Sequence, residues 1–360
     1  MSKTRRVTLL VILLLLVGSY FIIPLIDNFS PNDQEEIVDV NYASFSFSDN
    51  VSLKYGEKKK LAFTVFSKDV SKIELLVADS LIQQWSKPNG SIQFDLNSTV
   101  FPLGAQEVKL NIFINNALVA EDSRLVRILS DIQPLDMHAK VISLTPHNAS
   151  NFTQGLEFYK NQLLESTGQY GESKVMYIDQ KTGKSNKQTD VDATCFGEGI
   201  TVLNDKMYEI TWKEQKCFVY DVATLTLEKT INYTGEGWGL CNDGKNLIMT
   251  DGSERIYFRN PITFQIIKTI EVYDQKGPRI NLNELEYIDG KIYANVWQEN
   301  YILVIDPNLG RVEKIIHCED VIGQARGQGE VLNGIAYNPN TKKLYLTGKN
   351  WSKLAEVSIH

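Results

Sequence analysis

One short pattern occurs five times in the last 220 or so residues of the chain. In each copy a small or polar residue precedes an aliphatic anchor, and a turn, a hydrophobic pair and a polar exit follow. Successive anchors are 40 to 50 residues apart. Self-similarity at a period of this length is typical of repeat architectures, so it constrains the fold more than any single motif. The copies are Gln154-Gly155-Leu156, Glu198-Gly199-Ile200, Trp238-Gly239-Leu240, Asn283-Glu284-Leu285 and Asn333-Gly334-Ile335.

Each repeat contains the pattern of four short strands. In the first repeat an inner strand at 156–158 is followed by a tight turn and a second strand at 163–166. A third strand of recurring form comes next, and a polar fourth strand follows a Thr or Gly turn. Four strands in a unit of about 44 residues are typical of a propeller blade, so five units predict a five-bladed β-propeller over residues 139–360. The third strands are Met176-Tyr177-Ile178-Asp179, Phe218-Val219-Tyr220-Asp221, Ile256-Tyr257-Phe258-Arg259 and Leu303-Val304-Ile305-Asp306.

The two ends of the repeat region favour a closed ring over a solenoid, which is the competing architecture. The fifth repeat stops after its third strand, at Leu354 to Ile359. An isolated strand at Lys140 to Leu144 precedes the first repeat and can supply the missing fourth strand. Closure of this kind removes the exposed edges that an open sheet would present.

The N-terminal segment predicts a membrane anchor. Residues 1–6 carry three basic side chains, and residues 7–26 carry no charge. Twenty such residues are about the length of a helix that crosses a bilayer, and the preceding positive charge places residues 1–6 in the cytoplasm. The lack of a small-x-small cleavage site favours an uncleaved signal-anchor, with a cleaved signal peptide as the alternative. We therefore expect a transmembrane helix at 7–26, a spacer at 27–40, and later domains on the extracytoplasmic, periplasmic side, or secretion if the segment is cleaved.

Residues 41–130 predict a second domain of a different kind. Short runs there alternate hydrophobic and polar residues, as in Leu61-x-Phe63-x-Val65 and Ile73-x-Leu75-x-Val77, and turn residues interrupt them. Period-two patterning indicates half-buried strands, and six or seven of them in roughly 90 residues suggest an immunoglobulin-like β-sandwich. A linker at 131–138 joins it to the propeller. Because the segment holds no chemical constellation, we expect a spacer or a module that docks an unidentified partner.

Charge and residue counts exclude several classes of function. The net charge is −7 and no basic face is clustered, which argues against nucleic-acid binding. The four histidines do not pair at metal-ligand spacing, and no G-x-S-x-G elbow is present. The cysteines have no CxxC spacing, so we expect no zinc site and no cofactor. We read them as buried thiols, with Cys195–Cys217 pairing left open, and we expect a monomer. The cysteines are Cys195, Cys217, Cys241 and Cys318.

Propeller geometry gathers particular side chains on one face. Inner strands run along the central channel, so the residues two before the anchors form a ring: Gln154, Glu198, Trp238, Asn283 and Asn333. Second strands are antiparallel to the first, so they end at the same face, and their ends carry Trp212, Trp297 and Lys349. Phe152 and Phe196 each precede a ring residue by two. A single aromatic residue at a blade position usually packs between blades, but this gathering predicts a pocket.

The polar groups of this pocket suit proton transfer. A carboxyl group walled by aromatic rings is poorly solvated, which raises its pKa, whereas Lys349 would lower the pKa of Glu198 if the two are close. A single glutamate speaks against the two-carboxylate arrangement of glycosidases. What remains is proton transfer with oxyanion stabilisation, as acyl-type chemistry on a small uncharged group requires.

Several segments at these positions resemble the plant-type glutaminyl-peptide cyclotransferases. They lie in order over roughly residues 139–360, whereas the first 138 residues depart from the family pattern. The resemblance implies a five-bladed propeller that cyclises the N-terminal glutamine of peptides or proteins to pyroglutamate and releases ammonia, an acyltransferase reaction without a metal. The segments are Phe152-Thr153-Gln154-Gly155, Phe196-Gly197-Glu198-Gly199, Gly237-Trp238-Gly239-Leu240, Leu282-Asn283-Glu284-Leu285-Glu286-Tyr287, Val296-Trp297-Gln298 and Val331-Leu332-Asn333-Gly334-Ile335 with Thr347-Gly348-Lys349.

The resemblance also implies roles for individual residues. Glu198 is expected to be the general acid/base, with Asn283 and Lys349 completing the catalytic set. A non-catalytic propeller that binds peptides or glycans, with a sandwich that docks a partner, is the alternative function. Activity that persists with a chelator would separate the cyclotransferase from a metal hydrolase. The expected substrate-binding residues are Phe152, Gln154, Phe196, Trp212, Trp238, Trp297 and Asn333.

Overall fold

The computed structural model describes residues 41–360. The transmembrane helix and spacer expected at 7–26 and 27–40 lie outside this range. No helix within it is long and apolar enough to cross a bilayer. Apart from a 3-10 turn, η1 (Ser98–Val100), and one short helix, α2 (Glu319–Ala325), every element in the range is a strand, so the all-β class is confirmed.

The first domain consists of two sheets whose strands alternate buried and exposed residues. One sheet has the order β1-β3-β6 and the other β2-β8-β7-β4-β5, with β2 parallel to β8. Eight strands exceed the six or seven expected, because the edge strand β5 is almost entirely exposed and shows no clear alternation. The strands are β1 (Ala43–Phe45), β2 (Val51–Lys54), β3 (Lys58–Val65), β4 (Lys72–Val77), β5 (Ser80–Ser86), β6 (Gly90–Asn97), β7 (Gly104–Ile114) and β8 (Ala117–Leu129).

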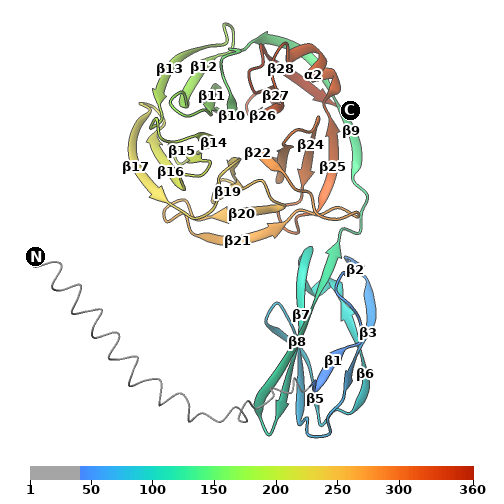
Figure 1. The fold of residues 1–360 in the computed structure, drawn as a ribbon. Coiled ribbons are helices and arrows are strands. Elements are labelled where there is room, and N and C mark those ends of the chain that lie inside the picture. Colours follow the sequence, from blue (N-terminus) through green and yellow to red (C-terminus); the bar gives the residue numbers. More distant parts are fainter. Residues whose placement is uncertain (1–40) are drawn as a thin grey trace, which may run out of the picture. The chain divides into compact units, whose positions relative to one another are not determined.

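The second domain contains five antiparallel units of four strands each, arranged around a central axis (Figure 1). In each unit the first strand lies nearest the axis, and the propeller-like fold is confirmed. The first two units are β10 (Thr153–Tyr159), β11 (Gln162–Thr167), β12 (Lys174–Asp179), β13 (Lys184–Asp190), and β14 (Gly197–Leu203), β15 (Lys206–Thr211), β16 (Lys216–Asp221), β17 (Thr226–Asn232). The third is β18 (Leu240–Asn242), β19 (Leu247–Thr250), β20 (Arg255–Arg259), β21 (Ile266–Glu271). The last two are β22 (Leu282–Ile288), β23 (Lys291–Val296), β24 (Tyr301–Ile305), β25 (Val312–His317), and β26 (Leu332–Asn338), β27 (Lys343–Gly348), β28 (Lys353–Ile359) with β9 (Leu135–Pro146).

The strand β9 closes the ring. Its residues 139–146 pair antiparallel with β28 and supply the fourth strand of the fifth unit, as the sequence predicts. Its residues 135–138 pair parallel with β25 of the fourth unit. The strand therefore begins at Leu135, inside the segment expected to be a linker at 131–138, because that segment lies beside β25 and completes its hydrogen bonding.

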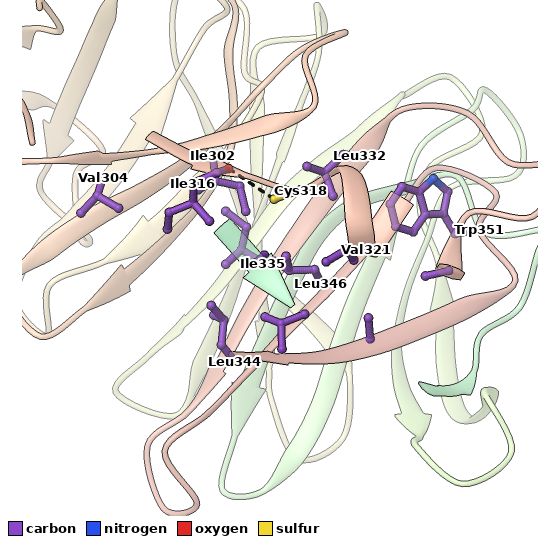
Figure 2. Close-up of a cluster of buried hydrophobic side chains, with 14 of the residues drawn as sticks. Ile302, Val304, Ile316, Cys318, Val321, Leu332, Ile335, Leu344, Leu346 and Trp351 are labelled. Carbon is purple, nitrogen blue, oxygen red and sulfur yellow. Dashed lines mark hydrogen bonds between the residues drawn. The ribbon is translucent and has the colours of Figure 1, made fainter. Parts of the chain in front are cut away.

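A buried apolar cluster lies between the fourth and fifth units (Figure 2). Val321 and Ala325 project into it from one face of α2, at the i and i+4 spacing of a helix. The sequence analysis did not anticipate this helix. Cys318 donates a hydrogen bond from its Sγ to the Ile316 carbonyl at 3.4 Å. All four cysteines are buried free thiols, so Cys195 and Cys217 do not form the disulfide that was left open.

Two buried glutamates occupy equivalent positions in the first two units, opposite the anchors Leu156 and Ile200. Glu165 accepts hydrogen bonds from several side chains. Glu209 accepts one from the Tyr220 hydroxyl at 2.9 Å, and its Oε1 has no partner within residues 41–360. Burial raises the pKa of the Glu209 carboxyl to about 8, although the bond from Tyr220 opposes this.

We expect the Glu209→Gln variant to be less sensitive to alkaline pH than the unmodified protein. The folded pKa of Glu209 exceeds the ordinary 4.5. The contribution of Glu209 to stability is therefore complete below the unfolded pKa and is lost as pH rises through the folded one. An amide does not ionise, so the variant should gain on the order of 4 kcal/mol relative to the parent between about pH 5 and pH 9. Urea unfolding at both pH values measures this, and an equal pH dependence in the two proteins would contradict it.

Candidate active site

The ring residues lie at irregularities of the inner strands. The register between first and second strands shifts at Thr153/Gly155, Gly197/Ile200, Leu282/Leu285 and Leu332/Ile335. Each shift spans a ring residue, and in the third unit Trp238 directly precedes the short strand β18. Bulges of this kind redirect side chains and are common beside active sites. The repeated pattern therefore encodes a bulge as well as a strand.

The glycines that follow the ring residues allow the inner strands to approach one another. A Cβ atom on Gly199 would lie 2.4 Å from the amide nitrogen of Leu240, and one on Gly155 would lie 2.5 Å from that of Ile200. Both distances are too short for any side chain, so only glycine fits there. This close approach places neighbouring ring residues around one narrow channel mouth.

The channel mouth holds a hollow of about 290 Å³. Trp212, Trp297 and Lys349 enter it directly after the ends of β15, β23 and β27, as the antiparallel geometry predicts. Nine of the ten predicted site residues line this one hollow, so residues up to 197 positions apart in the sequence meet there. The lining residues are Phe152, Gln154, Phe196, Glu198, Trp212, Trp238, Asn283, Trp297 and Lys349.

Asn333 is the predicted site residue that does not line the hollow. It is buried, and its Nδ2 donates to the Thr153 carbonyl at 2.9 Å and to Gln154 Oε1 at 3.3 Å. Its carboxamide is therefore engaged in orienting Gln154. Asn333 Oδ1 has no hydrogen-bond partner among the described residues, and its expected contact with the substrate stays a prediction.

Aromatic rings in edge-to-face contact form the walls of the hollow. The ring centroids of Phe152 and Phe196 are 6.2 Å apart, and those of Phe196 and Trp212 are 5.7 Å apart. On the other side Trp238 and Trp297 meet at 5.9 Å with an interplanar angle of 88°. Such contacts favour fixed ring orientations. The walls are thus preformed, and Trp297, which is 38% exposed, lies at the open side.

Three polar groups face the hollow without a protein partner. Glu198, Asn283 and Lys349 are 5%, 2% and 6% exposed. Within the described residues, the carboxyl of Glu198 and the ammonium of Lys349 have no hydrogen bond, and Asn283 Oδ1 is buried without one. Lys349 Nζ lies 4.7 Å from the centroid of the Phe152 ring. Because buried polar groups in proteins are normally paired, these three indicate a site whose partner is a ligand.

The surroundings raise the pKa of Glu198 and lower the pKa of Lys349. Burial raises the pKa of the Glu198 carboxyl well above its ordinary value, and Lys349 opposes this while nearby carboxylates add to it. Burial also lowers the pKa of the Lys349 ammonium, against the opposing effect of Glu198. Both shifts bring the groups toward the neutral range, where a proton can be given and taken back.

Two acidic residues beside the aromatic walls were missed from the sequence. Glu236 Oε2 accepts hydrogen bonds from the indoles of Trp212 and Trp238. Glu214 accepts one from the Tyr170 hydroxyl at 2.9 Å and another from the main-chain N–H of Phe196. The repeat register could have found Glu236, because it precedes Trp238 by two, as Phe152 and Phe196 precede their ring residues. Glu214 follows Trp212 by two, as Glu299 follows Trp297, so the same comparison could have found it.

In the part of the chain that the structure describes, no group of three or more His, Cys, Asp or Glu side chains could hold a metal ion. The hollow instead offers one carboxyl, one ammonium and two carboxamides.

The fold and the site together define an enzyme-like propeller whose channel mouth is an aromatic-walled pocket with one carboxyl and one amine. The family model described as glutamine cyclotransferase matches residues 114–359, and the chain belongs to this family. The resemblance found in the motifs is thereby confirmed. Residues 41–113, which include most of the sandwich, lie outside the matched range.

Two known proteins illustrate the relationship. The chain is 37% identical over 227 residues to the glutaminyl-peptide cyclotransferase of Arabidopsis thaliana, a match that covers 61% of this chain and 71% of the relative. The crystal structure of Myxococcus xanthus glutaminyl cyclase is 32% identical and superposes with a TM-score of 0.59. That match covers 63% of this chain and 98% of the bacterial enzyme. Both relatives match a part of this chain about the size of the propeller.

Proposed function

We propose that this protein cyclises the N-terminal glutamine of peptides to pyroglutamate with Glu198 as the general acid/base. The chain is a glutaminyl-peptide cyclotransferase, and the observation that carries the assigned roles is the set of three unpartnered polar groups in the aromatic hollow. The hollow is large enough for one glutamine residue and offers partners for its amide. An amine and an amide are the groups that the reaction joins.

The reaction needs one proton to be moved twice. The free α-amine, with a pKa near ~7.7–8, attacks the side-chain amide carbon of the same residue and forms the ring C–N bond. Glu198 accepts the proton that this nitrogen sheds and returns it to the departing nitrogen. The old C–N bond then breaks, and ammonia leaves. The carboxyl ends in the state in which it began, so no other reactant is required.

The remaining residues orient the substrate and stabilise charge. Lys349 places an ammonium where the amide oxygen becomes negative, and Asn283 lines the hollow with a carboxamide that can bind the substrate amide. The aromatic walls hold the flexible side chain folded back over its own amine. Orientation of this kind makes an intramolecular attack fast.

Ammonia release from a dipeptide that begins with glutamine tests the proposed function. The full chain should release ammonia from the free dipeptide and none from the same dipeptide carrying an N-acetyl group, because acetylation removes the nucleophile. Silence from well-folded protein, or equal release from both peptides, would contradict the assignment.

The Lys349→Met variant should move the acid limb of the kcat/KM profile to higher pH. Burial raises the pKa of Glu198 and Lys349 lowers it, so removal of the ammonium leaves burial less opposed. Glu198 must lose its proton before it can accept one, hence activity starts at higher pH. We also expect kcat/KM at the optimum to fall about 10²–10³-fold, since one oxyanion partner is lost.

Rates between about pH 5 and pH 9 measure this shift. Lys213→Met is the matched control, because it removes the same charge from an exposed residue outside the hollow. The ammonium of Lys213 lies over the Trp212 ring. An acid limb that stays in place or moves to lower pH in Lys349→Met would contradict the role of the ammonium.

The location and the finer architecture are part of the same proposal. The uncharged segment at 7–26 after three basic residues supports a membrane-anchored enzyme whose folded domains are extracytoplasmic. Eight strands in two sheets support an immunoglobulin-like sandwich that acts as spacer or docking module, and five four-stranded units support a five-bladed propeller. Recovery of the protein in the soluble fraction of lysed cells would count against the anchor.

A further inference from the structure

One carboxylate joins two of the tryptophans that wall the hollow. Glu236 Oε2 accepts a hydrogen bond from Trp212 Nε1 at 2.8 Å and another from Trp238 Nε1 at 3.1 Å. The two indoles come from different propeller units, since Trp212 follows β15 and Trp238 precedes β18. A single carboxylate oxygen therefore links the indoles of two wall tryptophans.

The main chain holds Glu236 in this place. The next residue, Gly237, donates its N–H to the Trp212 carbonyl at 3.0 Å. A Cβ atom on Gly237 would lie 2.3 Å from the Tyr233 hydroxyl oxygen and 2.8 Å from the Thr211 carbonyl oxygen, so glycine is required for this approach. The segment that carries Glu236 is thus tied to the end of β15, which places the carboxylate beside both indoles.

An indole N–H can only donate, so each of these tryptophans needs an acceptor. In the described residues Glu236 is the hydrogen-bond partner of both indole nitrogens. Without it each ring could turn about its side-chain bonds, and the width of the hollow would no longer be fixed. Trp238 also contacts Trp297 edge to face, so a change in the orientation of Trp238 would also affect Trp297.

We propose that Glu236 is a positioning residue that fixes the indoles of Trp212 and Trp238 and thereby holds the glutamine side chain folded for attack on itself. This inference rests on the proposed function and adds a residue that the family motifs did not single out. Glu236 acts through the two rings and needs no contact with the reacting atoms.

The Glu236→Ala variant tests the proposal. We expect kcat/KM to fall by up to about 10²-fold, with most of the loss in kcat, because the substrate still binds but no longer adopts the attacking geometry. Glu236→Gln keeps an oxygen that can accept both indoles, so it should restore activity to within about threefold of the parent. Glu228→Ala, which removes a carboxylate from the outer strand of the same unit, is the matched control and should leave the rate unchanged.

A double-mutant cycle separates positioning from a general loss of stability. In a Trp212→Phe, Trp238→Phe background the rings remain but the donors are gone, so Glu236→Ala should have little further effect on kcat. An effect as large there as in the parent would overturn the proposal. Full activity of Glu236→Ala would also overturn it, as would a Glu236→Gln variant as impaired as the alanine variant.

Near-ultraviolet circular dichroism reports the indoles independently of turnover. The signal of the tryptophans should weaken in Glu236→Ala and persist in Glu236→Gln and Glu228→Ala. If the parent itself cyclised no glutamine, the proposed function would fail while this spectroscopic result could still stand. If the parent were active and the spectra of all variants matched, the positioning role alone would fail.

Discussion

The Glu198→Gln variant is expected to fold normally and to lose about a thousandfold or more of its turnover. Glutamine matches glutamate in shape, but its amide cannot accept the proton that the attacking amine sheds, and general acid–base groups contribute about 10²–10⁴-fold. The loss of a buried, unpartnered carboxyl also removes a cost of burial, so stability should hold or increase. Ammonia release under saturating substrate measures turnover, and urea unfolding measures stability.

The Glu228→Gln variant is the matched control for this experiment, because its carboxylate pairs with Lys206 on the outside of the same unit. It should keep the full rate. A Glu198→Gln protein that turns over at a rate near that of the parent would end the role assigned to Glu198, and it would leave the family membership untouched.

Replacing Glu165 with glutamine should lower the free energy of unfolding by about 3–5 kcal/mol, the usual cost of breaking a buried ion pair. Glu165 accepts hydrogen bonds from Thr153 Oγ1 at 2.7 Å, from Asn151 Nδ2 at 2.8 Å and from His147 Nε2 at 3.1 Å. The other ring nitrogen of His147 bonds the Trp351 carbonyl at 2.8 Å. The network therefore joins the segment after β9 to the segment that carries Lys349.

The pH dependence of this loss has a definite sign. Burial alone would lower the pKa of His147, but Glu165 and the hydrogen bonds outweigh it and raise that pKa above 6.5. The stabilisation is therefore complete below the unfolded pKa and declines as pH rises through the folded one. The difference between parent and Glu165→Gln should be largest at about pH 5–6.

The equivalent position in the second unit provides the control. Glu209→Gln should be neutral or stabilising at alkaline pH, because the carboxyl of Glu209 has one partner where Glu165 has three. If both variants lost the same stability, the loss in Glu165→Gln would come from the position of the residue and not from its hydrogen bonds. Chemical unfolding of the two variants side by side decides the matter.

The repeat pattern predicted which residues gather in the hollow because the ring follows the symmetry of the fold. Glu198 and Asn283 are both two residues before an anchor, and Lys349 is at the end of a second strand, so period and strand direction together place them at one mouth. Asn333 is the ring residue that does not line the hollow. Asn333 occupies the same register as the other ring residues, but its side chain is buried and donates a hydrogen bond to Gln154. Periodicity does not reveal which polar neighbour a side chain will bond.

Features outside the repeat symmetry escaped prediction. Because α2 has only seven residues, it is too short for a helical period to stand out. The start of β9 was placed too late because Leu135 to His138 pair with β25, a strand nearly 180 residues further along the chain. Pairing partners at such separations are a tertiary property.

The way β9 closes the ring has a consequence for how the enzyme acquires activity as it folds. Residues 139–146 must find residues 353–359, more than 200 positions away, and contacts of that range are slow to form because they carry a large loop-closure entropy. Lys349 belongs to the unit that this pairing completes, whereas Glu198 belongs to a unit whose four strands are consecutive in sequence. A chain whose early units have formed thus holds Glu198 in place without Lys349. Catalytic competence should therefore appear in a refolding experiment only with the last, slowest phase.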